Sequence, residues 1–72
     1  MKWIIERAGI LHNKSTQGLI VQHMFKVNPS GDDYHSYYAT AHVRKGKLIE
    51  ITWLEPPHQD QNKIEIQITN KL

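Results

Sequence analysis

The stretch from residue 34 to residue 55 constrains the fold most, because it has the period of a β-strand on both sides of a turn signal. Small residues such as Ala39 and Ala41 occupy odd positions before the turn, and large ones such as Ile51 and Trp53 occupy odd positions after it. Successive side chains of a strand point to opposite faces, so this period predicts two strands. We therefore predict a β-hairpin that turns at Arg44-Lys45-Gly46.

The same pattern predicts the register of the hairpin. A three-residue loop with Gly46 in the left-handed conformation places small residues opposite large ones on one face. A two-residue loop would pair Ala41 with Glu50 and mix apolar and charged residues on that face, so the longer loop is favoured. The predicted cross-strand pairs are Val43–Lys47, Ala41–Ile49, Ala39–Ile51 and Tyr37–Trp53.

A helix over about residues 31–45 is the alternative for the first half of this stretch. Ser30 and Asp33 have the spacing of a capping box, and Arg44, Lys45 and Gly46 suit a helix end. The segment is nevertheless dominated by Tyr, His, Thr, Ser and Val, which are mediocre helix formers. The strand is favoured, and the helix would give a ββαββ fold of the α+β class.

Three further segments are predicted to be strands, the first with apolar residues on both of its faces, and polar or proline-containing loops separate them. Residues 2–12 are predicted to be a strand with a bulge at Ala8-Gly9, and residues 19–27 a second strand. Residues 63–69 alternate isoleucine with polar side chains and are predicted to be the last strand.

Five strands in 72 residues predict a single small all-β domain. The expected architecture is a five-stranded antiparallel meander, either a curled sheet or a small, partly open barrel. Inward-facing positions give the expected core. Its members are Trp3, Ile5, Leu19, Val21, Phe25, Val27, Ala39, Ala41, Val43, Ile49, Ile51, Trp53, Ile64, Ile66 and Ile68.

Composition excludes several classes of function. The chain has no cysteine, so disulfides and thiolate metal sites are excluded. Its net charge of +2 is too small to indicate nucleic-acid binding by itself. The apolar run at the N-terminus is too short for a signal peptide, and the longest uncharged run, residues 15–25, is too short to cross a bilayer. A cytoplasmic protein that does not enter a membrane is expected.

Five histidines invite a metal or acid–base hypothesis, but their spacing argues against it. No two of them stand two apart on one strand or four apart on one helix, and no carboxylate completes a ligand motif beside them. No nucleophile motif or phosphate-binding glycine loop is present either. We expect a non-catalytic protein with no metal and no cofactor.

Aromatic and basic side chains are expected on the outward, even face of the second and third strands. Flat aromatic faces beside positive charge bind single-stranded nucleic acid, because bases stack while Lys and Arg meet phosphates. The candidate binding residues are Met24, Lys26, Tyr34, Tyr38, His42 and Arg44.

Surplus apolar residues and exposed strand edges favour a different function, the binding of a protein. Edges at residues 2–12 or 63–69 would pair readily with another chain. The surplus apolar positions are Ile4, Ile10, Ile20, Leu48 and Leu54. We therefore expect an accessory or inhibitory interaction module with a protein partner or a second copy of itself, and weak single-stranded nucleic-acid binding is the alternative.

Overall fold

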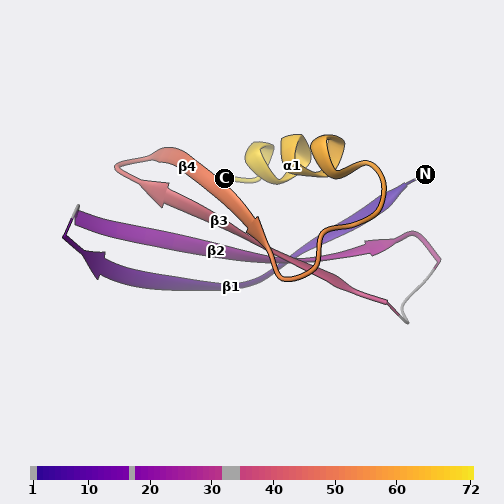
Figure 1. Cartoon of the computed structure of the whole chain (residues 1–72), viewed down its shortest axis with the longest axis horizontal. Coiled ribbons are helices and arrows are strands. Elements are labelled where there is room, and N and C mark those ends of the chain that lie inside the picture. The colour runs from indigo at the N-terminus through magenta and orange to yellow at the C-terminus, as the bar shows by residue number, and fades with distance from the viewer. Residues whose placement is uncertain (1, 17, 32–34) are drawn as a thin grey trace.

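The computed structural model describes residues 2–16, 18–31 and 35–72, and folds them into one antiparallel sheet followed by one helix (Figure 1). The sheet has the order β1-β2-β3-β4, which is a meander. This confirms the predicted antiparallel fold class, as an open sheet with β1 and β4 at its edges. The elements are β1 (Trp3–Ser15), β2 (Gly18–Pro29), β3 (Tyr37–Arg44), β4 (Lys47–Trp53) and α1 (Gln61–Asn70).

The predicted fifth strand is wrong, because residues 63–69 lie inside helix α1. Ile64 and Ile68 are both fully buried, whereas Ile66 between them is 63% exposed. Residues four apart share one face of a helix, and residues two apart do not. The isoleucine spacing therefore fits both periods, and packing against the sheet selects the helix. The alternative helix over residues 31–45 is also wrong where the chain is described, since β3 begins at Tyr37.

The predicted register of the second hairpin is wrong: the partner of Val43 is off by one residue, and the partners of Ala41 and Ala39 are off by two, which keeps their parity. Arg44 pairs with Lys47, and only Lys45 and Gly46 form the turn. Both have positive φ, 52° and 76°, as a type I′ turn requires. A bulge at Ile49 then shifts the register, so that Ala41 pairs with Ile51 and Ala39 with Trp53. The bulge restores the small-against-large pairing that a two-residue turn alone would have broken.

The first hairpin is longer than predicted and contains the predicted bulge. Pairing of β1 with β2 extends from Trp3 opposite Pro29 to Ser15 opposite Gly18, with a register shift between Arg7 and Gly9. A Cβ atom at Gly9 would lie only 3.0 Å from the Met24 Cε atom, so glycine makes room for this methionine. Beyond the bulge, the odd and even side chains of β1 exchange faces.

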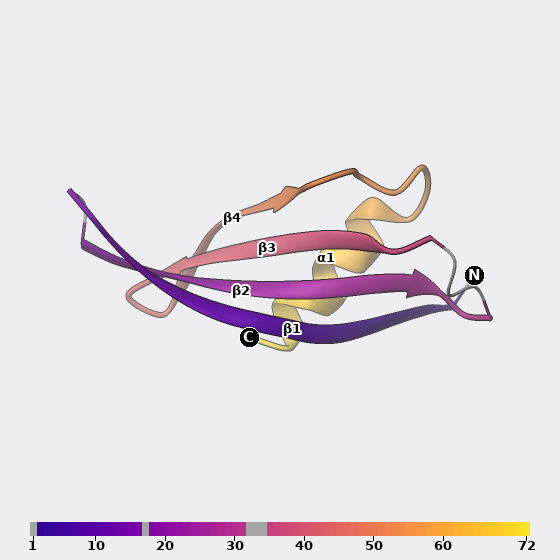
Figure 2. The same cartoon turned by 90° about the horizontal axis from the view of Figure 1, so that it is seen from below.

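Helix α1 covers one face of the sheet, and the main core lies between them (Figures 1 and 2). Two indole groups fasten the helix to the two edges of the sheet. Trp3 Nε1 of β1 donates to Asp60 Oδ2 (2.9 Å), and Trp53 Nε1 of β4 donates to Glu65 Oε2 (2.8 Å). The buried core residues are Trp3, Phe25, Val27, Ala39, Ala41, Ile64 and Ile68, with Ile5, Tyr37, Ile51 and Trp53 packed against them.

Three predicted core residues are exposed. Leu19 is 52% exposed, Ile49 is 50% exposed and Ile66 is 63% exposed. Each has its own cause. Leu19 lies near the β1–β2 turn, beyond the reach of the helix (Figure 2). Ile49 is the extra residue of the β4 bulge, and Ile66 points away from the face of α1 that holds Ile64 and Ile68.

Candidate functional site

The sheet face opposite α1 is the principal candidate site, because no element of the described chain packs over it (Figure 2). We call it the open face. Cross-strand pairing arranges its side chains in rows that run from β1 to β4. The rows contain Glu6, Lys26 and Tyr38; then Gly9, Met24, Thr40 and Thr52; then Leu11, Gln22, His42 and Glu50; and finally Asn13, Ile20, Arg44 and Lys47.

Five of the six predicted binding residues lie on this face. Lys26 pairs directly with Tyr38, and Met24 belongs to the next row. Tyr38 is 45% exposed and Met24 is 36% exposed, so both present apolar surface to solvent. His42 and Arg44 lie farther along β3 toward the β3–β4 turn, and the sixth residue, Tyr34, lies outside the described residues.

A chain of hydrogen bonds crosses the open face from β1 to β4. Asn13 Nδ2 donates to Gln22 Oε1 (2.9 Å), and Gln22 Nε2 donates to His42 Nδ1 (3.2 Å). His42 Nδ1 is thus an acceptor, so Nε2 carries the hydrogen and donates to Thr52 Oγ1 (3.0 Å). Both nitrogens of His42 are occupied by neighbouring strands, which indicates that this histidine orders the sheet.

Charges of both signs are interspersed on the open face. Glu6 is the cross-strand neighbour of Lys26, and Glu50 is the cross-strand neighbour of His42. Opposite charges on directly paired residues, as on Glu6 and Lys26, reduce each other's field. The face therefore combines a few exposed apolar side chains with charges of both signs, and the sequence alone did not show this because Lys26 and His42 were assigned without their neighbours on β1 and β4.

Arg7 occupies the helix-covered side of the sheet and joins three elements. Its Nη1 atom donates to His23 Nδ1 (2.7 Å), its Nη2 atom donates to the Lys71 carbonyl oxygen (2.9 Å), and its guanidinium lies 5.2 Å from the centre of the Phe25 ring. Burial, followed by the charges of Arg7 and His12, lowers the pKa of His23 below 6.5. Nothing in the sequence links Arg7 to Lys71, because the contact depends on where α1 ends.

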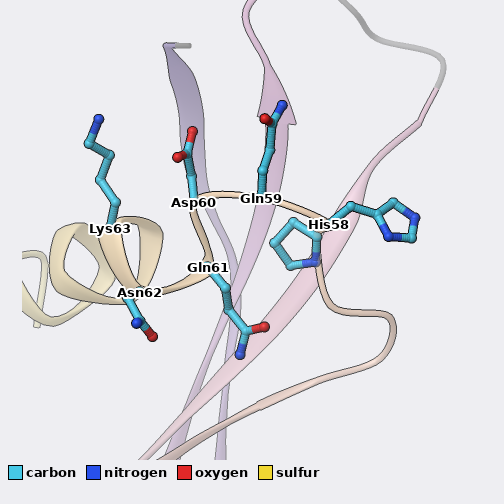
Figure 3. A pocket seen from close by; sticks show the side chains of 7 residues that line it. His58, Gln59, Asp60, Gln61, Asn62 and Lys63 are labelled. Carbon is cyan, nitrogen blue, oxygen red and sulfur yellow. The ribbon is translucent and has the colours of Figure 1, made fainter.

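The described residues also form clefts outside the open face. One, at the start of α1, is lined by residues 57–63, but its side chains do not converge: Gln59 and Asp60 point to one side, and Gln61 and Asn62 to the other (Figure 3). The second, of about 470 Å³, lies between β4 and α1. Sequence reasoning could not find this β4–α1 cleft, because it read the helix as a strand.

Within residues 2–16, 18–31 and 35–72, no three His, Asp or Glu side chains gather closely enough to hold a metal ion. Of the described residues, none belongs to a helix with the length and hydropathy of a membrane span. Comparison with models of protein families, with curated proteins and with solved structures gave no match.

Proposed function

We propose that this domain is a non-catalytic protein-interaction module that binds a second copy of its own chain through the open face. The observation that carries the proposal is the one-sided covering of the sheet: α1 packs on one face, while Met24, Tyr38 and Leu11 remain exposed on the other. Contiguous exposed apolar side chains mark interaction surfaces. A protein partner buries such side chains over a broad, flat area.

The distribution of charge supports a second copy as the partner. A two-fold axis parallel to the strands, between β2 and β3, would bring β2 of each copy over β3 of the other. Because Lys26 and Tyr38 are cross-strand neighbours, this axis places each Lys26 over the partner's Tyr38. An ammonium over an aromatic ring is favourable, and the balanced charge of the face allows two copies to meet without like-charge repulsion.

Substitution of Met24 by glutamate tests this function. We expect the wild-type chain to dimerise between micromolar and millimolar concentration in sedimentation equilibrium. Met24→Glu buries a charge without a partner in the interface and should weaken dimerisation at least about tenfold, which is about 1.4 kcal/mol.

The matched control is Ile66→Glu, which changes an exposed apolar residue on the opposite layer of the molecule. This variant should dimerise like the wild type. A chain that stays monomeric throughout the concentration range, or a dimer equally insensitive to both substitutions, contradicts the proposal.

Binding of single-stranded nucleic acid is the second candidate function, and the pairing of Lys26 with the exposed Tyr38 favours it. A base could stack on the ring while the ammonium meets a phosphate. Affinity would fall as salt is added, with a slope of about −0.7 per phosphate contact. Glu6 beside Lys26 opposes this function. An oligonucleotide whose fluorescence polarisation does not change at low salt would exclude it.

A further inference from the structure

The β4–α1 cleft lies at a free sheet edge, away from the open face. We propose that it binds an extended, basic segment of a different protein, which adds to β4 as a fifth strand. The segment would alternate apolar residues with lysine or arginine. This inference goes beyond the proposed self-association, because it uses another surface and another partner.

The backbone of β4 presents unused hydrogen-bonding groups to this cleft. The Leu54 amide donates to the Tyr38 carbonyl oxygen (3.0 Å), which sets the alternation of the antiparallel ladder between β3 and β4. By that alternation, the N–H and C=O groups of Ile51 and Trp53 face the outer edge. In the described part of the chain, no backbone group from a turn, loop or helix cap bonds to either residue. An added strand would pair with these groups.

The side chains that line the cleft determine which strand it accepts. Leu48, Ile49 and Ile66 are 37%, 50% and 63% exposed, and would pack against apolar side chains of the added segment. The remaining lining includes the Glu65 carboxylate and no basic side chain, and Glu50 adds a second negative charge on the other face of the same edge strand. Glu65 Oε2 already accepts bonds from Trp53 and Gln61, so this carboxylate is fixed in place. A negative, apolar edge is complementary to a positive, apolar strand.

The two edges of this chain itself are poorer occupants. Two-fold pairing of β4 with β4 of a second copy would bring together two edges that each carry Glu50 and Glu65, and this like-charge approach is unfavourable. Pairing of the β1 edge of one copy with the β4 edge of the next is a head-to-tail contact, which builds an open row of copies instead of a closed pair. Both arguments favour a different protein as the partner.

A blocked seven-residue peptide of alternating lysine and valine tests the proposal, with a peptide of alternating glutamate and valine as its control. We expect the lysine peptide to bind and to slow hydrogen exchange of the Ile51 and Trp53 amides, and the glutamate peptide to bind at least about tenfold more weakly. Ile66→Lys removes an apolar side chain that lines the cleft and adds a positive charge that repels the lysine peptide. It should therefore lower the affinity for this peptide at least about tenfold. Ile10→Lys, at a similarly exposed apolar position on β1, should leave its affinity within about twofold.

Every outcome decides the proposal. It is overturned if the lysine peptide does not bind at millimolar concentration, if both peptides bind equally, or if protection appears on β1. It is also overturned if the Ile51 and Trp53 amides become protected by raising the protein concentration alone, because a second copy then occupies the edge. The same titration in Met24→Glu should give the wild-type affinity, which separates this site from dimerisation through the open face.

Discussion

The two faces of the sheet differ in what covers them, although neighbouring residues of the same strands build both. Phe25 is completely buried beneath α1, while Met24, the preceding residue of β2, is 36% exposed on the open face. Both side chains are large and apolar. The position of the helix, and not apolar character, therefore decides which of the two becomes core and which remains available to a partner.

The core on the covered face is small, so each of its few residues contributes a large share of the stability of the domain. Four large side chains, Phe25, Ile64, Ile68 and Val27, are fully buried, and all of them lie between β2, β3 and α1. A domain of 72 residues buries a modest share of its surface and is only marginally stable. Loss of any one of these contacts should remove a large part of the total stability, whereas changes on the open face should affect association first.

The largest expected effect is that of Phe25→Ala. Removal of this ring leaves a cavity under α1 and should lower the free energy of unfolding by about 3–5 kcal/mol. Met24→Ala on the other face should cost less than about 1 kcal/mol, because its side chain is partly in solvent already. Urea denaturation of both variants measures the contrast. Equal losses for the two residues would show that both faces are covered in solution.

The next largest effect separates the two sides of the helix. Ile68→Ala should lower the free energy of unfolding by about 2–5 kcal/mol, because the side chain is fully buried against the sheet. Ile66→Ala should cost less than about 0.5 kcal/mol, since this residue is exposed and alanine is the better helix former. Thermal denaturation followed by circular dichroism gives both values. Similar losses at the two positions would indicate a strand, in which both side chains share a face.

Local patterns predicted the strands well and the helix badly. Alternation in residues 37–43 predicts a strand unambiguously, because a second alternating segment, residues 47–53, follows after a turn. Each of the two segments supplies the pairing partner of the other. Ile64, Ile66 and Ile68 all satisfy period two, while Ile64 and Ile68 also have the i, i+4 spacing of a helix face. The position of this segment over the sheet distinguishes a helix from a strand, and the hydrogen bonds from Trp3 and Trp53 fix that position. Such long-range contacts have no local signal.

The same limit applies to the candidate sites. Alternation alone placed Met24, Lys26 and Tyr38 on one face. A register that is wrong by an even number of residues still leaves each side chain on its correct face. The neighbouring carboxylate Glu6 could be assigned to that face only with the β1–β2 register, which depends on the bulge at Gly9. The β4–α1 cleft was inaccessible to sequence reasoning, because it requires both the helix and the second bulge.

The smallest expected effect concerns pH and again separates the two faces. The pKa of His23, on the covered side, is lowered below 6.5 by burial and by the charges of Arg7 and His12. The unfolded chain therefore binds a proton at His23 that the folded chain resists, so the free energy of unfolding should fall as pH drops below about 6.5. His23→Gln should make this fall shallower, because a glutamine does not titrate and its carbonyl oxygen can still accept the bond from Arg7. His42→Gln on the open face is the control. Urea denaturation between pH 7.5 and about pH 5.5 measures this dependence and avoids most carboxylate titration. If His23→Gln leaves the slope of the free energy of unfolding against pH unchanged, the folded protein binds the proton at His23 as readily as the unfolded chain.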